Sequence, residues 1–127
     1  MKHTFWNFTA AIKNGLTAKK QKIVHSNTKL NRNVAEVLWN EGYILGFKAL
    51  KNGKLEIFLK YNKNCVPTIA NIKSLSKPGK RLYFSYKNIC EISNESCIII
   101  LSTTKGIVTS VECKKFRLGG EPLLVVS

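Results

Sequence analysis

The chain has 127 residues, of which 44% are hydrophobic, and its 21 lysines and arginines against seven acidic residues give a formal net charge of +14. This length supports one compact domain or two small lobes, and the longest aliphatic run is too short to span a bilayer. The charge favours a polyanionic partner, because cations that neutralise phosphates release counterions. A purely solubilising surface would mix both signs, and membrane-surface binding would need a separate basic amphipathic helix that the pattern lacks, so we expect no membrane partner.

The N-terminal part reads as two helices separated by a short strand. Apolar residues spaced by three and four predict a helix from Thr4 to about Lys19 and a second one from about Leu30 to Gly42. A small strand is expected at Lys22–His25, and the hydroxyl or amide side chains at 26–28 can cap the second helix.

A β-hairpin should follow. The strands Tyr43–Leu50 and Lys54–Tyr61 flank Asn52-Gly53, which fits a tight two-residue turn, and the second strand alternates apolar and polar residues. A third strand at about Thr68–Ser74 would complete the first lobe.

The Pro-Gly break within Ser74–Phe84 is the best boundary between lobes, and we expect a strand after it. We therefore predict an α/β (α+β) protein of two small lobes. Residues 1–74 would form an α-β-α-β-β lobe, and residues 75–127 a mainly β lobe with a short helix.

The second lobe contains a dense hydroxyl cluster. A helical or loop segment around Tyr86–Ile92 and a strand at Cys97–Leu101 precede it. Thr109 and Glu112 match the capping box S/T-x-x-E, which predicts a short helix to about Phe116. A glycine pair then ends the helix, and the last apolar strand comprises residues 123–126.

Enzymatic motifs are incomplete. Ser102 to Lys105 match S-x-x-K, but the S-D-N and K-T-G elements of penicillin-recognising enzymes are missing. In a phosphate-binding NTPase loop the lysine follows the glycine, whereas here Lys105 precedes Gly106. The acids suggest no catalytic dyad, no two cysteines are spaced C-x-x-C, and His3 and His25 lie far from the cysteines. We expect no enzyme, no metal, no cofactor and no small-molecule substrate.

RNA binding is the remaining chemistry. Hydroxyls and backbone amides after a strand can contact phosphates, base edges or the 2′-OH, while Lys105 adds charge and Gly106 permits close approach. Glu121 could pair with a basic side chain or accept a base amino group. Tyr83 and Tyr86 could pack or stack on a base.

Three segments carry a resemblance to a known family. "SKPGKRLY" at 76–83, "LSTTKGIVT" at 101–109 and "LGGE" at 118–121 occur in order, and "IKNG", "SNTKL" and "VLWNEGYI" agree in the first half. The chain resembles, over nearly its whole length, the small-subunit ribosomal protein eight family of bacteria and organelles.

The resemblance implies a noncatalytic protein that binds the central domain of small-subunit ribosomal RNA, organises the platform, and touches neighbouring ribosomal proteins. A free RNA-binding translational regulator is the alternative. Carried over, the RNA-binding residues would be Ser102, Thr103, Thr104, Lys105, Gly106, Tyr83, Gly120, Glu121 and Lys29. Low arginine, abundant asparagine, isoleucine and lysine, and no presequence favour a mitochondrial copy, with a plastid or bacterial cytoplasm as the alternative.

The chain departs from the family pattern at several places, three of them in the second lobe. Thr104 stands where the third residue of the hydroxyl motif is commonly serine, and Ser110 where an aspartate is common. Pro122 follows Glu121 directly and removes a backbone donor. These changes preserve the expected fold and alter the detail of the RNA contacts.

Overall fold

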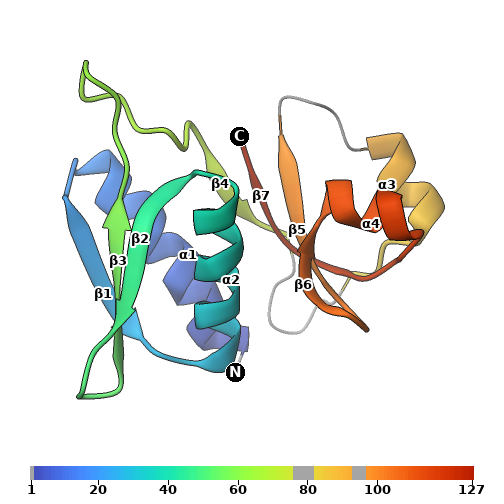
Figure 1. The fold of residues 1–127 in the computed structure, drawn as a ribbon, viewed down its shortest axis with the longest axis horizontal. Helices are drawn as coiled ribbons and strands as arrows, with labels where there is room; N and C mark the ends of the chain where they lie inside the picture. The colour runs from blue at the N-terminus through green and yellow to red at the C-terminus, as the bar shows by residue number, and fades with distance from the viewer. Residues whose placement is uncertain (1, 76–81, 93–96) are drawn as a thin grey trace. The chain divides into compact units, whose positions relative to one another are not determined.

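The computed structural model describes residues 2–75, 82–92 and 97–127, which form two compact units of residues 1–70 and 71–127 (Figure 1). The first unit contains α1 (Lys2–Thr17), β1 (Lys22–Ser26), α2 (Lys29–Asn40), β2 (Ile44–Ala49) and β3 (Lys54–Leu59). The second contains β4 (Ile72–Ser74), α3 (Tyr86–Ile92), β5 (Ile98–Thr103), β6 (Gly106–Thr109), α4 (Ser110–Phe116) and β7 (Glu121–Val126). The predicted α+β class and the α-β-α-β-β order of the first lobe are confirmed.

The first unit packs its two helices against an antiparallel sheet of order β1-β3-β2. Along the central strand β3, Leu55, Ile57 and Leu59 are buried, while the residues between them are partly exposed. This alternation is what one buried sheet face requires. α1 contacts β1, α2 contacts β2, and the helices fill the core with Phe8, Ile12, Val34 and Leu38.

Both ends of α2 follow from its sequence. The Asn31 N–H donates to Oγ1 of Thr28 at 3.1 Å, so Thr28 is the N-cap among the three predicted candidates. At the other end Gly42 has φ +80°, and the Tyr43 N–H donates to the Leu38 carbonyl at 2.9 Å. Glycine reaches this left-handed conformation without a Cβ clash, which is why the helix stops there.

The β2–β3 turn differs from the prediction. The Leu50 N–H donates to the Lys54 carbonyl at 2.8 Å, which leaves the three residues 51–53 as the loop. Only Gly53, at φ +75°, takes positive φ, and Asn52 does not. A three-residue loop of this kind combines an ordinary turn with one left-handed residue. The two-residue turn was therefore wrong, although Gly53 was correctly placed in the turn.

The second unit is built on an antiparallel sheet of order β4-β7-β5-β6. β4 pairs with β7, with Ile72 opposite Val126, so the prediction that this strand completes the first lobe was wrong. A three-residue strand has too little pattern to specify its partner, and here the C-terminal strand supplies it. The Pro-Gly break and most of the segment after it lie outside the described residues, and Phe84 forms only an isolated bridge.

The core of the second unit lies between the helices and the sheet. Ile89 of α3, Ile99 and Leu101 of β5, and Cys113 of α4 are buried together. Burial raises the pKa of the Cys113 thiol, and the nearby Glu112 carboxylate adds to the effect. Cys113 is therefore a neutral core thiol. α4 also contacts β5 and β6, which holds the end of the β5–β6 hairpin against the unit's core.

Candidate RNA-binding surface

The predicted hydroxyl loop is a tight hairpin, which we call the hydroxyl hairpin and define as residues 102–106. β5 ends at Thr103 and β6 begins at Gly106. The two residues between them, Thr104 and Lys105, form the turn. Gly106 has φ +107°, a conformation that favours glycine. The sequence reading expected a loop leading straight into a helix and missed β6. The four-residue strand lies between a glycine and a helix cap, and both of those signals suggest a loop.

The three hydroxyls of the hairpin have different roles. Oγ1 of Thr103 donates to the Gly106 carbonyl at 2.9 Å and accepts the Lys105 N–H at 3.1 Å, so this hydroxyl stabilises the turn. In the described part of the chain, the side chains of Ser102 and Thr104 have no hydrogen-bond partner. Ser102 is half-buried and Thr104 is exposed. These two hydroxyls are therefore available to an external partner.

The two hydroxyls at the junction of β6 and α4 serve the fold. Oγ1 of Thr109 accepts the Glu112 N–H at 3.3 Å, which confirms Thr109 as the N-cap of α4. Oγ of Ser110 accepts the Ile99 N–H at 3.3 Å and ties α4 to β5. Both side chains are buried. The hydroxyl cluster thus divides into a structural set and an accessible set.

Three other predicted residues lie beside the hairpin. β7 pairs with β5 so that Glu121 is opposite Ser102, and Gly120 immediately precedes it. Phe84 and Gly120 exchange two backbone hydrogen bonds of 2.8 and 2.9 Å, which brings the preceding Tyr83 to the same edge. Tyr83 is 70% exposed, as a residue available for stacking should be. The fold therefore gathers these residues from three separate segments of the chain.

Pro122 fits the sheet at an irregular point. It lies opposite Leu101, where the β5–β7 register shifts between Ile100 and Leu101. Proline lacks a donor and is tolerated in sheets at such irregularities. The departure from the family pattern at this position is thus absorbed by a local bulge, while the neighbouring Glu121 still pairs with Ser102.

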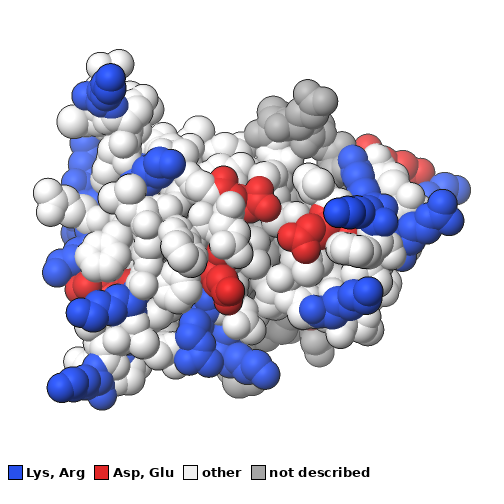
Figure 2. Space-filling view, in the orientation of Figure 1, with Lys and Arg blue, Asp and Glu red and all other residues white. Residues whose placement is uncertain are grey.

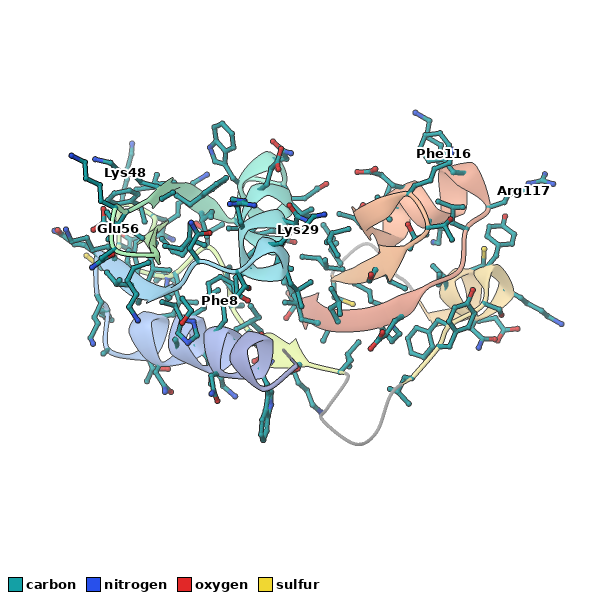
Figure 3. All side chains as sticks on the ribbon, turned by 90° about the horizontal axis from the view of Figure 1, so that it is seen from below. Phe8, Lys29, Lys48, Glu56, Phe116 and Arg117 are labelled. Carbon is teal, nitrogen blue, oxygen red and sulfur yellow. The ribbon has the colours of Figure 1, made fainter. Side chains whose placement is uncertain are left out.

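An aromatic residue that sequence reasoning missed supports the hairpin's lysine. Nζ of Lys105 lies 5.0 Å from the Phe116 ring centroid, and Nζ of Lys115 lies 5.6 Å from it. Figure 3 shows Phe116 and Arg117 projecting from the end of α4. Cation–π contacts of this length are attractive. The available signal was a phenylalanine at the predicted end of a helix, followed by arginine and preceded by two lysines.

Lys29 belongs to the other unit. It is the first residue of α2 and its side chain is exposed (Figure 3). A contact between Lys29 and the RNA backbone therefore remains a separate prediction, independent of the cluster around Ser102.

His25 lies on β1 with its ring 5.6 Å from that of Phe8, and burial, with the nearby Lys54 charge, lowers its pKa. Across residues 2–75, 82–92 and 97–127, no group of three or more potential metal ligands is found. Within those same ranges, no helix is both long and apolar enough to cross a membrane.

Comparisons with known proteins identify the family. The model of the family described as "Ribosomal protein S8" matches residues 4–126. The chain belongs to the ribosomal protein S8 family. The family resemblance predicted from the sequence is thus confirmed, and the chain is a structural constituent of the small ribosomal subunit and not an enzyme.

Relatives match over nearly their full length. The small ribosomal subunit protein uS8c of Tupiella akineta is 42% identical over 123 residues, covering 94% of each chain. The uS8m protein of Acanthamoeba castellanii is 37% identical and covers 95% of this chain and 96% of its own. The uS8 protein of Bartonella bacilliformis is 41% identical, with 88% and 87% covered. Chloroplast, mitochondrial and bacterial forms all match at 37–42% identity, so these matches do not decide the compartment.

Proposed function

We propose that this S8-family chain binds the central domain of its small-subunit ribosomal RNA through the hydroxyl hairpin and the adjacent edge of β7. As a small-subunit protein it has ribosomal RNA and other ribosomal proteins as partners. The observation that carries the proposal is the pair of unengaged hydroxyls on Ser102 and Thr104, next to the exposed Lys105. Hydroxyls without an internal partner can donate to phosphates, base edges or the 2′-OH.

Each member of the surface has a distinct role in this proposal. Thr103 and Gly106 fix the turn. Lys105, whose ammonium group lies over the Phe116 ring, contacts a phosphate. Gly120 lets the start of β7 lie close to Ser102, and Glu121, beside Ser102, accepts a base amino group. Tyr83 stacks on an unpaired base. Lys29 of the first unit contacts the RNA backbone.

The proposed setting is early assembly of the subunit's platform in a mitochondrion, and a plastid or a bacterial cytoplasm is the alternative. The composition supports this choice: lysine, asparagine and isoleucine are abundant, and arginine occurs only three times. These residues are the ones that AT-rich genomes encode often. Cell fractionation followed by detection of the protein in purified organelles tests it.

The test of the RNA proposal is a footprint combined with a salt titration. We expect the full chain to protect a contiguous site in the small-subunit RNA of its own compartment, and log affinity to fall linearly with log salt. Protection outside the central domain would contradict the proposed site. Co-sedimentation addresses the alternative of a free translational regulator, because a regulator would be found mainly away from the small subunit.

A further inference from the structure

The outer face of α2 and the adjoining part of β2 carry features that RNA binding does not use. We propose that this face binds an arginine- or lysine-bearing segment of a neighbouring protein. The proposal rests on membership of the small subunit, where the chain has protein neighbours, and it is independent of the hydroxyl hairpin in the other unit. The face is here called the Trp39 face and comprises Glu36, Trp39, Glu41, Gly46 and Phe47.

The Trp39 face has an aromatic hollow. Trp39, Gly46 and Phe47 line a volume of about 120 Å³, well above the roughly 10–15 Å³ that admits one water. The Trp39 and Phe47 rings meet edge to face, with centroids 6.1 Å apart and planes at 83°. Trp39 is nevertheless 51% exposed, and Leu45, at a β2 irregularity, is 63% exposed. Such a hollow can take a planar or extended side-chain group.

Two of the few acids of this strongly positive chain lie on the Trp39 face. Among residues 1–70 there are three acids. Glu56 pairs with Lys22 at 3.2 Å, but Glu36 and Glu41 are exposed and have no ion-pair partner within the described ranges. Glu36 lies one helical turn before Trp39, and Glu41 is the C-cap of α2. Figure 2 shows acidic side chains gathered over α2.

This charge order opposes what helix stability favours. The first turn of α2 contains no acid and the last turn contains no base. The helix dipole favours the reverse, with anions near the N-terminus and cations near the C-terminus. Lys29 and Arg32 lie in the N-terminal half and the two glutamates in the C-terminal half. Nζ of Lys60 reaches the Gly42 carbonyl at 3.2 Å, which offsets part of the negative end. The two exposed glutamates are therefore available to an external cation.

A cationic side chain fits this face better than RNA or a second copy does. An ammonium or guanidinium gains from the aromatic faces and from the carboxylates together. A phosphate backbone would be repelled by Glu36 and Glu41. Two copies of the chain, each with a net charge of +14, would repel one another, which disfavours self-association. The occupant we infer is thus a basic segment of another protein.

Titration followed by tryptophan fluorescence tests the inference. The chain has two tryptophans, so Trp6→Phe leaves Trp39 as the only tryptophan to be excited selectively. The probe is a blocked hexapeptide with two arginines, and the control peptide has citrulline at both positions. We expect a saturable change in Trp39 emission with the arginine peptide and none with the citrulline peptide, despite the positive charge of the protein.

Matched variants separate this site from general charge effects. The double variant Glu36→Gln with Glu41→Gln should bind the arginine peptide about two- to fivefold more weakly. Glu91→Gln, in the other unit, should leave this affinity unchanged. Gly46→Leu should fill the hollow and weaken binding similarly. A Cβ at Gly46 meets no atom within 4 Å, so we expect the variant to fold, as circular dichroism would verify.

Four outcomes would overturn the inference. The first is no response to the arginine peptide, and the second is a response that the glutamine variants leave unchanged. The third is a Trp39 response to a single-stranded RNA oligonucleotide but not to the peptide, which would indicate base stacking. The fourth is a change with protein concentration alone, which would indicate a second copy. Failure here leaves the RNA footprint unaffected, because the proposed RNA site rests on the hydroxyl hairpin and the peptide titration reports on Trp39.

Discussion

Gly120 lies against the backbone of Ser102 with no room for a side chain. A Cβ on Gly120 would come within 2.5 Å of the Ser102 carbonyl oxygen and 2.8 Å of Cγ2 of Thr103. The first of these atoms is backbone and cannot rotate away. The glycine therefore sets the separation between the start of β7 and the hydroxyl hairpin, and with it the position of Glu121 beside Ser102.

Replacing Gly120 by alanine should destabilise the second unit by about 1–3 kcal/mol, because the sheet must shift to admit the methyl group. Chemical denaturation followed by circular dichroism measures the loss in the free energy of unfolding. Gly46→Ala is the matched control, since its Cβ meets nothing within 4 Å. Equal stability of the two variants would contradict the close approach of Gly120 to Ser102.

Removing the Phe116 ring should weaken RNA binding through Lys105. In Phe116→Leu both lysines lose an aromatic face at 5.0 and 5.6 Å, and Lys105 becomes less ordered. We expect affinity for the RNA fragment to fall by about two- to fivefold at low salt. Val111→Ala removes another exposed apolar side chain of α4 and serves as the control. If both variants bind like the wild type, Phe116 does not position Lys105.

Much of the first unit could be predicted because its patterns are long. The alternation of Leu55, Ile57 and Leu59 fixes which face of β3 is buried. The spacing of apolar residues in α1 and α2 likewise fixes which face of each helix is buried. Turn chemistry was less certain: a glycine at position 53 serves a two-residue and a three-residue loop alike. Thr28 could not be singled out as the cap, since three consecutive residues offered a suitable oxygen.

The second unit shows what short elements conceal. β4 has three residues and β6 has four, and neither length specifies a partner strand. The sequence placed Ser102, Thr103 and Thr104 in one class, but only the hairpin geometry separates Thr103, whose hydroxyl is used within the turn. The motifs that carry the family resemblance predicted Tyr83, Gly120 and Glu121 as site residues. Their proximity to Ser102 depends on the pairing of β5 with β7.

Stability should decrease as the pH falls through the range in which His25 titrates. Burial of the ring, with a smaller effect of the Lys54 charge, lowers the His25 pKa below 6.5, and the buried Nδ1 atom has no partner in the described structure. The unfolded chain then binds a proton more readily than the folded chain. The free energy of unfolding should thus fall as pH drops below 6.5 and level off below the folded pKa.

The pH dependence is measured by denaturant unfolding between about pH 5 and 7, where carboxylates change little. His25→Gln cannot take up the proton and should flatten the profile in this window. A wild-type profile that is flat, or that rises toward acid, would contradict the assignment.

The most direct test of the account is RNA binding by Ser102→Ala combined with Thr104→Ala. Both hydroxyls lack partners in the described structure, so their removal should leave the free energy of unfolding nearly unchanged. The free energy of binding to the small-subunit RNA site should become less favourable by about 1–3 kcal/mol, and discrimination against unrelated RNA should decrease as well. Because neutral groups are removed, the slope of log affinity against log salt should stay the same, whereas Lys105→Ala should reduce it by about one.

Thr17→Ala, in which an exposed hydroxyl of the first unit is removed, is the control. The measurement is a competition titration of the full chain against its own small-subunit RNA fragment and an unrelated RNA of equal length. We expect weaker and less selective binding for the double variant and unchanged binding for Thr17→Ala. A double variant that binds its site as tightly and as selectively as the wild type would contradict the central claim.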